Sequence, residues 1–262
     1  MNALSLFANV GIAETYLQDI GIDVVVANEL DEQRAKFYSH LYPQCDMVQG
    51  DITSQEIFEK VIRKAREANV ELIMATPPCQ GMSIAGHNSP YDERNSLIKY
   101  AIDAVIELNP RFVFFENVTQ QLVTPIVCNG EEMLIPEYIH RRLGNQYRFN
   151  NGQITNAMNY SVPQRRERCI FLLTRMDEGF TWNFPEPSRI INLDEAFRGI
   201  PDLWPNIREH AYQGLLPANT EEALSFHKWH RPPTHVWRNI ECMLHTPTGN
   251  TAFDNPFYYP KK

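Results

Sequence analysis

The sequence lacks the features that mark membrane, secreted and nucleotide-hydrolysing proteins. No apolar run approaches the ~20 residues that a membrane-spanning helix needs. The first residues have neither the basic region nor the cleavage site of a signal peptide. The absence of a Gly-x-x-x-x-Gly-Lys-Ser/Thr sequence argues against a Walker-type nucleotide site. The five cysteines are scattered without a Cys-x-x-Cys pair, which predicts free thiols and a cytoplasmic location.

The chain also lacks an excess of basic residues. It has 24 Lys and Arg against 32 Asp and Glu in 262 residues, and this net charge of -8 alone argues against a nucleic-acid partner. The charge is uneven, however, because Arg165, Arg166 and Arg168 form a tight cluster and residues 227–262 are more basic than acidic. Local charge is therefore the better guide. The histidines near Cys242 match no standard zinc-site spacing, so we expect no metal.

Strand and helix patterns alternate through the first part of the chain. We expect strands at residues 3–7, 23–29, 47–50, 72–75 and 111–115, and helices at 11–20, 55–68 and 96–108. A further helix is expected after Asp31, which can cap it, and carries Ala35, Phe37, Tyr38 and Leu41. This alternation predicts an α/β fold with a doubly wound, mostly parallel sheet and right-handed crossovers. A helix at 137–143 and strands at 147–155 and 169–174 follow, and the two strands predict an antiparallel hairpin at the end of this sheet.

The pattern changes after about residue 176, where prolines become frequent and helical stretches are brief, at 193–197 and 221–226. We therefore expect two regions, a compact domain over residues 1–180 and a loop-rich region over 181–262.

The stretch from Leu72 to Gly81 is the centre of the chemistry. Four buried-type residues predict a strand, Pro77 and Pro78 end it, and Cys79 follows at its carboxyl end. In open parallel sheets, ligands bind outside the carboxyl ends of the strands. A lone cysteine in a proline turn is more simply structural, so the function of Cys79 depends on what the other strand ends carry.

The first three strands all end in residues suited to a nucleoside. Residues 7–11 form a first turn in which the backbone can approach a ligand. Glu29 ends the second strand about 20 residues later, where an acid can bind ribose hydroxyls. Asp51 and Ile52 end the third strand and can meet an adenine ring. Each residue alone fits an ordinary helix-approach role, whereas three matching strand ends in one sheet favour a nucleoside-type ligand.

These motifs, in this order, resemble the DNA (cytosine-5)-methyltransferases. The resemblance covers about residues 3–174. It is carried by Phe7 to Gly11, Glu29, Asp51, Pro77-Pro78-Cys79-Gln80-Gly81, Glu116-Asn117-Val118 and Gln164-Arg165-Arg166-Glu167-Arg168. Two residues of the first turn region depart from the family pattern: Ser5 stands where an acid is usual, and Asn9 where glycine is usual. Gly11 is kept.

The resemblance implies a Rossmann-like fold and methyl transfer from S-adenosylmethionine to C5 of a flipped-out cytosine in double-stranded DNA, with S-adenosylhomocysteine as product. The Cys79 thiolate would add to C6 and make C5 nucleophilic. Glu116 would donate to N3 if burial raises its pKa, and Asn117 would orient this site. Arg168, supported by Arg166, would hold O2.

The resemblance also implies two sets of binding residues. The donor set comprises Phe7, Asn9, Gly11, Glu29, Leu30, Asp51, Ile52, Pro77 and Leu97. The set for the flipped nucleotide comprises Gln80, Ser83, Gln164 and Arg165.

The C-terminal part departs further from the family. The expected Gly-Asn-x-Val segment is absent, because the Gly-Asn pairs at 144 and 249 are not followed by that valine. We therefore expect residues 181–262 to begin an incomplete target-recognition region, and the isolated chain to need a C-terminal segment or a second subunit for activity. The leading hypothesis is a restriction–modification DNA methyltransferase. A tRNA cytosine-5 methyltransferase and a non-catalytic or split subunit remain alternatives.

Overall fold

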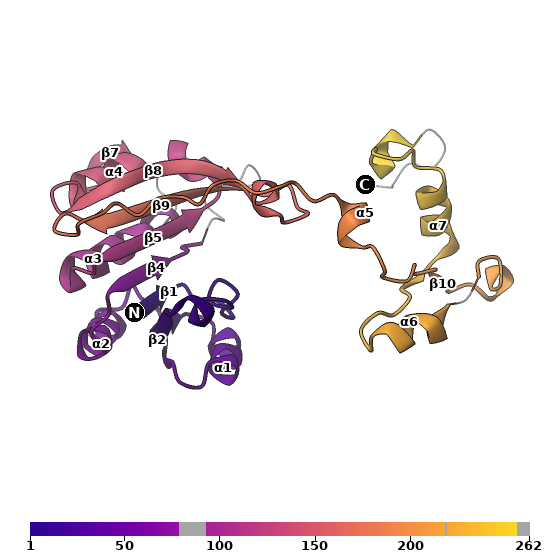
Figure 1. Ribbon diagram of the computed structural model, residues 1–262, viewed down its shortest axis with the longest axis horizontal. Helices are drawn as coiled ribbons and strands as arrows, with labels where there is room; N and C mark the ends of the chain where they lie inside the picture. Colours follow the sequence, from indigo (N-terminus) through magenta and orange to yellow (C-terminus); the bar gives the residue numbers. More distant parts are fainter. Residues whose placement is uncertain (79–92, 218, 256–262) are drawn as a thin grey trace. The chain divides into compact units, whose positions relative to one another are not determined.

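The computed structural model describes residues 1–78, 93–217 and 219–255, so Cys79, Gln80 and Ser83 lie outside the described residues. The chain divides into two compact units, Met1–Ile191 and Asn192–Lys262 (Figure 1). The strands of the first unit are β1 (Asn2–Leu6), β2 (Asp23–Glu29), β3 (Asp46–Gln49), β4 (Leu72–Ala75), β5 (Phe112–Asn117), β6 (Pro125–Cys128), β7 (Glu131–Leu134), β8 (Tyr147–Asn156) and β9 (Glu167–Arg175). Its α-helices are α1 (Glu32–Leu41), α2 (Gln55–Glu67), α3 (Ile98–Leu108) and α4 (Ile135–Leu143).

Seven of these strands form one sheet in the order β3-β2-β1-β4-β5-β9-β8. The first five run parallel, with Leu4 of β1 opposite Val26 of β2 and Ile73 of β4. Strands β9 and β8 are antiparallel to their neighbours and close the sheet as a hairpin. The predicted α/β class, the mostly parallel sheet and the C-terminal hairpin are confirmed.

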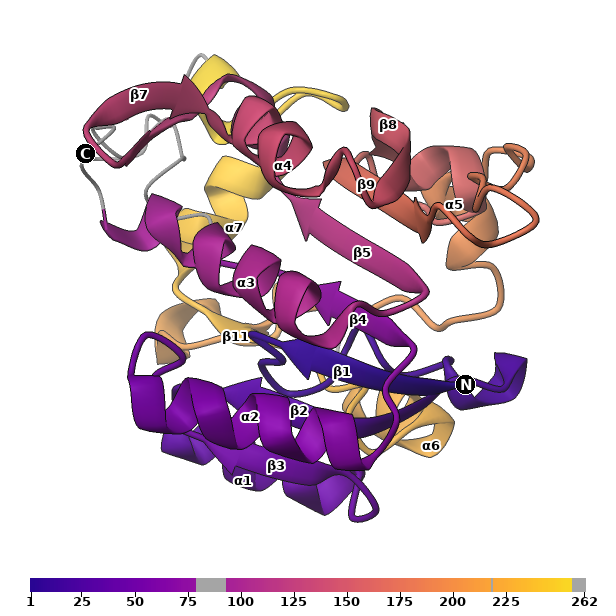
Figure 2. The same ribbon diagram turned by 90° about the vertical axis from the view of Figure 1, so that its left-hand side faces the viewer.

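The two faces of the sheet follow the alternation of residues along each strand. Leu4 and Leu6 belong to the main core, which also contains the apolar faces of α2, α3 and α4. Ala3 packs on the opposite face with Leu72 and Met74. Figure 2 shows α2, α3 and α4 lying across one face of the sheet, whereas α1 covers the other face in Figure 1. Successive β1 residues therefore point to opposite layers, which places Ser5 on the α1 side.

The helix expected over residues 11–20 is wrong. Residues beyond Gly11 form turns, and only Gln18–Ile20 makes a 3-10 helix. Ile12 and Tyr16 are 77% and 76% exposed, while the acidic residue Glu14 is buried. The left-handed backbone at Phe7, Asn9 and Gly11 and the burial of Glu14 set a different path for this stretch.

The remaining helices of the first unit follow their sequence signals closely. Asp31 caps α1 by accepting from the Arg34 N–H at 2.9 Å, and Ala35 and Tyr38 form its buried face. The β6–β7 hairpin was not expected, because it consists of two four-residue strands.

The second unit has little regular structure in its described part. It contains α5 (Leu193–Ala196), α6 (Thr220–Phe226), α7 (Trp237–Leu244) and the short parallel strands β10 (Asn206–Ile207) and β11 (Thr234–His235). Helices α5 and α6 agree with the sequence pattern, and α7 was missed. Tyr212 stacks on Trp237 with ring centroids 5.3 Å apart. None of the helices in the described ranges is long and apolar enough to cross a membrane.

Candidate active site

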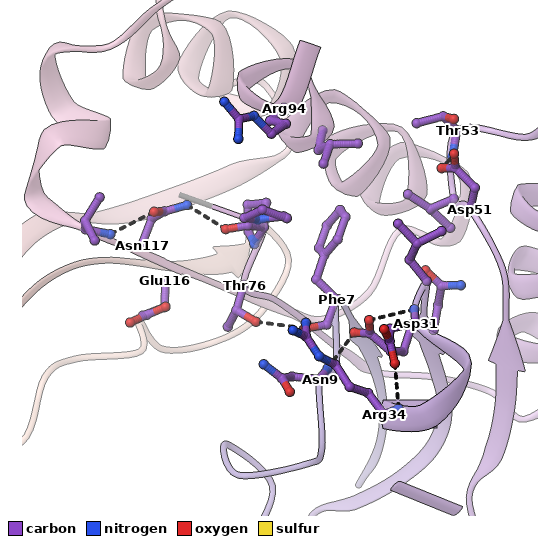
Figure 3. Close-up of a pocket in the computed structure, with 18 of the residues that line it drawn as sticks. Phe7, Asn9, Asp31, Arg34, Asp51, Thr53, Thr76, Arg94, Glu116 and Asn117 are labelled. Carbon is purple, nitrogen blue, oxygen red and sulfur yellow. Dashed lines mark hydrogen bonds between the residues drawn. The ribbon is translucent and has the colours of Figure 1, made fainter. Parts of the chain in front are cut away.

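A cleft of about 740 Å³ lies at the carboxyl ends of β1 to β5, entirely within the first unit (Figure 3). Residues that follow or end each of these strands line it: Phe7 and Asn9, Glu29 and Leu30, Asp51 and Ile52, Thr76 and Pro77, and Glu116 and Asn117. Strands that are far apart in sequence thus deliver their terminal residues to one place, as expected for a parallel sheet.

The turn after β1 is held by Glu29. Phe7 and Asn9 both have left-handed backbones, with φ of 59° and 52°. The Asn9 N–H donates to Glu29 Oε2 at 2.8 Å, and the Asp31 N–H donates to Oε1 at 3.0 Å. Glu29 is buried and lines the cleft. Because each carboxylate oxygen accepts more than one hydrogen bond, Glu29 can still bind a ligand hydroxyl.

Gly11 ends this turn and packs against Tyr42, and it is not among the residues that line the cleft. Its φ is +82°, and a Cβ at this position would lie 2.2 Å from a ring carbon of Tyr42. The Tyr42 hydroxyl donates to the Gly11 carbonyl at 2.5 Å. Glycine is therefore required for both backbone conformation and space.

Apolar side chains line the part of the cleft between β2, β3 and α3. Ile52 is buried, Leu97 packs partly against the main core, and Leu30 is largely exposed. Asp51 accepts the Thr53 N–H at 2.9 Å through Oδ1. These surroundings suit a flat aromatic ring bordered by one hydrogen-bonding carboxylate.

An ion pair marks the other end of the cleft. Arg168 Nε of β9 lies 3.0 Å from Glu116 Oε1 of β5, and Arg166 lines the same wall. Burial raises the pKa of the Glu116 carboxyl, and the positive charges of Arg168 and Arg166 oppose that rise. The direction matches the sequence-based expectation for this glutamate.

Two hydrogen bonds connect the tips of the central strands. Asn117 Nδ2 donates to the Pro77 carbonyl at 3.0 Å, and the Thr76 hydroxyl donates to the Phe7 carbonyl at 3.3 Å. Asn117 is buried. The strand ends of β1, β4 and β5 are thereby linked immediately before Cys79 in the sequence.

The structure does not bring all the predicted residues together. Gln164 and Arg165 are exposed and do not line the cleft. Cys79, Gln80 and Ser83 lie outside the described residues, although Pro78, the residue before Cys79, lines the cleft.

Three further charged residues line the cleft, Asp31, Arg34 and Arg94, and sequence reasoning gave none of them a role in the site. Arg34 lies in the first turn of α1, and its side chain extends toward Asn9 in Figure 3. The sequence signal that could have placed Arg34 near the cleft is its position five residues after Glu29, at the start of the helix that follows β2. Within the described ranges no group of three or more His, Cys, Asp or Glu could hold a metal ion.

Comparisons with known proteins agree with this architecture. The family model described as "C-5 cytosine-specific DNA methylase" matches residues 1–244. The chain is 37% identical to the type II methyltransferase M1.HgaI of Avibacterium volantium, covering 99% of this chain and 69% of that protein. It is 27% identical to M.XorII of Xanthomonas oryzae pv. oryzae, covering 76% of this chain and 46% of the relative.

One solved structure is similar to this chain in its fold. The Entamoeba histolytica methyltransferase EhMeth superposes with a TM-score of 0.57 at 18% identity, over 73% of this chain and 57% of that one. The chain thus spans between about half and two-thirds of the length of these three proteins. The family match over most of the chain and the close relative together lead to one conclusion: the chain belongs to the C-5 cytosine-specific DNA methylases.

Proposed function

We propose that this chain carries the catalytic region of a restriction–modification enzyme that methylates cytosine C5 in double-stranded DNA from S-adenosylmethionine. The observation that carries the proposal is the single cleft with two unlike ends. Glu29, Asp51 and Ile52 line one end, and Glu116, Arg166 and Arg168 line the other. Pro77 and Pro78 lie in the same wall and lead directly to Cys79.

The first end of the cleft fits the methyl donor. Glu29 would accept hydrogen bonds from the ribose hydroxyls, Asp51 from the adenine amine, and Ile52, Leu30 and Leu97 would contact the ring. The donor supplies an electrophilic sulfonium methyl group. Arg34, whose side chain extends toward Asn9 of the turn after β1, would neutralise the carboxylate of the methionyl part. A guanidinium matches a carboxylate in both charge and shape.

The second end fits a flipped cytosine. The Cys79 thiolate would form a bond to C6, and the ring electrons would move to C5, which takes the methyl group. Loss of the C5 proton and departure of the cysteine would then restore the ring. Glu116 in its protonated form would donate to N3, and Arg168 would donate to O2.

The second unit supplies a candidate DNA surface. No acidic residue occurs between Glu222 and Glu241, whereas Lys228, Arg231 and Arg238 lie in this stretch. We assign residues 181–262 to target recognition on this charge pattern. Completion by a C-terminal segment or a second subunit stays a prediction.

The test is methyl transfer from labelled S-adenosylmethionine to duplex DNA, with tRNA as a parallel substrate, followed by base analysis of the product. We expect 5-methylcytosine in DNA when a C-terminal fragment is present, in line with the expectation from the sequence. Label in tRNA alone would favour the alternative substrate, and label on adenine or on cytosine N4 would contradict the proposal.

A further inference from the structure

We propose that Glu14 is a positioning residue for the methyl donor. Its carboxyl group, bonded to Ser5, holds the turn of residues 7–11 in the shape that presents Phe7 and Asn9 to the cleft. The inference rests on the proposed function, because it takes the cleft to be the donor site.

The bond between Glu14 and Ser5 spans the whole turn. The Ser5 hydroxyl donates to Glu14 Oε1 at 2.5 Å, and the two residues are 4% and 3% exposed. Ser5 is fixed in β1 between Ala27 of β2 and Met74 of β4. Glu14 belongs to the chain that leaves the turn. The bond therefore closes a loop that contains every residue from Leu6 to Ala13.

The backbone conformation of this loop depends on contacts with the residues around it. Left-handed φ angles at Phe7 and Asn9 are unfavourable for residues with side chains and persist where the surroundings enforce them. Glu29 holds the Asn9 N–H, Thr76 holds the Phe7 carbonyl and Tyr42 holds the Gly11 carbonyl. Glu14 adds the contact that fixes the exit of the turn to the strand from which it started.

Packing alone does not account for a glutamate at this position. A carboxyl group is among the costliest groups to bury, and the neighbouring apolar residues Ile12 and Tyr16 are the exposed ones. Within the described residues Oε2 of Glu14 has no hydrogen-bond partner at normal bonding distance. The Tyr38 hydroxyl acts on the same carboxyl at longer range, and the Tyr38 ring lies 3.0 Å from the place where a Gly11 Cβ would be. Glu14 thus connects to both ends of the turn.

The experiment compares Ser5→Ala, Glu14→Leu, their double variant and Glu14→Gln in the full chain. Thr174→Val is the matched control. Thr174 is a buried residue of the same sheet away from the cleft, and its hydroxyl accepts a hydrogen bond from the Trp182 N–H at 2.8 Å, which valine would remove. Two quantities are measured on each protein: the Kd of S-adenosylhomocysteine by calorimetry, and hydrogen exchange of the amides in residues 7–11.

We expect Ser5→Ala and Glu14→Leu each to weaken binding roughly tenfold and to speed exchange in the turn, with the double variant no weaker than either single. Glu14→Gln keeps the acceptor oxygen and should bind within about twofold of the unchanged chain. Thr174→Val should change neither quantity.

The inference would be overturned if Ser5→Ala and Glu14→Leu left both the hydrogen exchange of residues 7–11 and the affinity for S-adenosylhomocysteine unchanged. It would also be overturned if Thr174→Val lost as much affinity as these two variants. If the unchanged chain bound no S-adenosylhomocysteine, the proposed function would fail instead. The exchange measurement would still decide whether Glu14 holds the turn, including in Glu14→Gln if the leucine variant does not fold.

Discussion

Glu116 and Arg168 face each other across two antiparallel strands, with Oε1 and Nε 3.0 Å apart and 24% of each side chain exposed. The pair is neither fully buried nor fully solvated. Burial raises the pKa of Glu116, and the arginine limits this rise by stabilising the carboxylate. One pocket can therefore offer a proton donor and a fixed cation to the same pyrimidine ring.

The first prediction concerns the pH dependence of methyl transfer. In the proposed mechanism the protonated form of Glu116 donates to N3, so its contribution to kcat should be present below its raised pKa and lost as the pH rises through it. Glu116→Gln donates at every pH and should remove this alkaline loss. The check is kcat against pH for both proteins, and an alkaline loss that persists unchanged in Glu116→Gln would assign it to another group.

The second prediction concerns the nucleophile. Cys79→Ala should abolish methyl transfer while the Kd of S-adenosylhomocysteine changes by less than about threefold, because the thiol acts on the base and not on the donor. DNA containing 5-fluorocytosine should form a covalent adduct with the unchanged chain. Mass mapping of that adduct to Cys45, Cys128, Cys169 or Cys242 would contradict the assignment.

The third prediction concerns Glu29. Replacing it by alanine removes the acceptor for two backbone N–H groups and for the ribose hydroxyls. Binding of S-adenosylhomocysteine should weaken by about 1–3 kcal/mol. Glu29→Gln should also weaken it, because its amide NH2 would face one of those N–H donors. Glu32→Gln, at an exposed position of α1 that does not line the cleft, is the control and should bind normally. Equal affinity in all three variants would be evidence against this placement of the ribose.

The fourth prediction separates the two halves of the donor. Arg34→Ala should weaken binding of S-adenosylhomocysteine roughly tenfold but leave 5′-methylthioadenosine, which has no amino-acid part, nearly unaffected. Calorimetry with both ligands gives the comparison. A similar loss for both would show that Arg34 acts on the nucleoside or on the fold.

The fifth prediction concerns the stability of the folded chain. Burial raises the pKa of Glu14 in the folded protein. Its stabilising contribution is therefore complete below the unfolded pKa and is lost as the pH rises through the folded pKa. Glu14→Gln cannot ionise, so its free energy of unfolding relative to the unchanged chain should increase from pH 5 to pH 8. Urea unfolding at the two pH values measures this, and a constant difference would contradict it.

The sheet could be predicted from sequence because its signals are local. Buried strands such as β4 are short apolar runs, and α1 follows an aspartate at its N-cap. The residues at the strand ends could be predicted because the topology of a parallel sheet brings those ends to one edge. Glu29 and Asp51 were found in this way, and Glu116 through the resemblance of its motif to the family.

The rest depends on contacts that sequence spacing does not reveal. Residues 11–20 carry helix-compatible residues, but the left-handed turn before them and the burial of Glu14 decide their conformation. The Ser5–Glu14 bond joins a strand to a turn, and neither residue stands out alone. Arg34 belongs to a helix whose residues looked structural, and its place in the cleft follows from how α1 leaves β2.

The adjacent residues Thr76 and Pro77 are each tied to a different neighbour, one to Phe7 of the first turn and the other to Asn117 of β5. A chain segment bonded in this way on both sides has a fixed length. Insertion of a single residue between Ala75 and Pro78 would have to break one of the two hydrogen bonds, so the length of this connection, and not only its composition, determines where Pro78 meets the cleft.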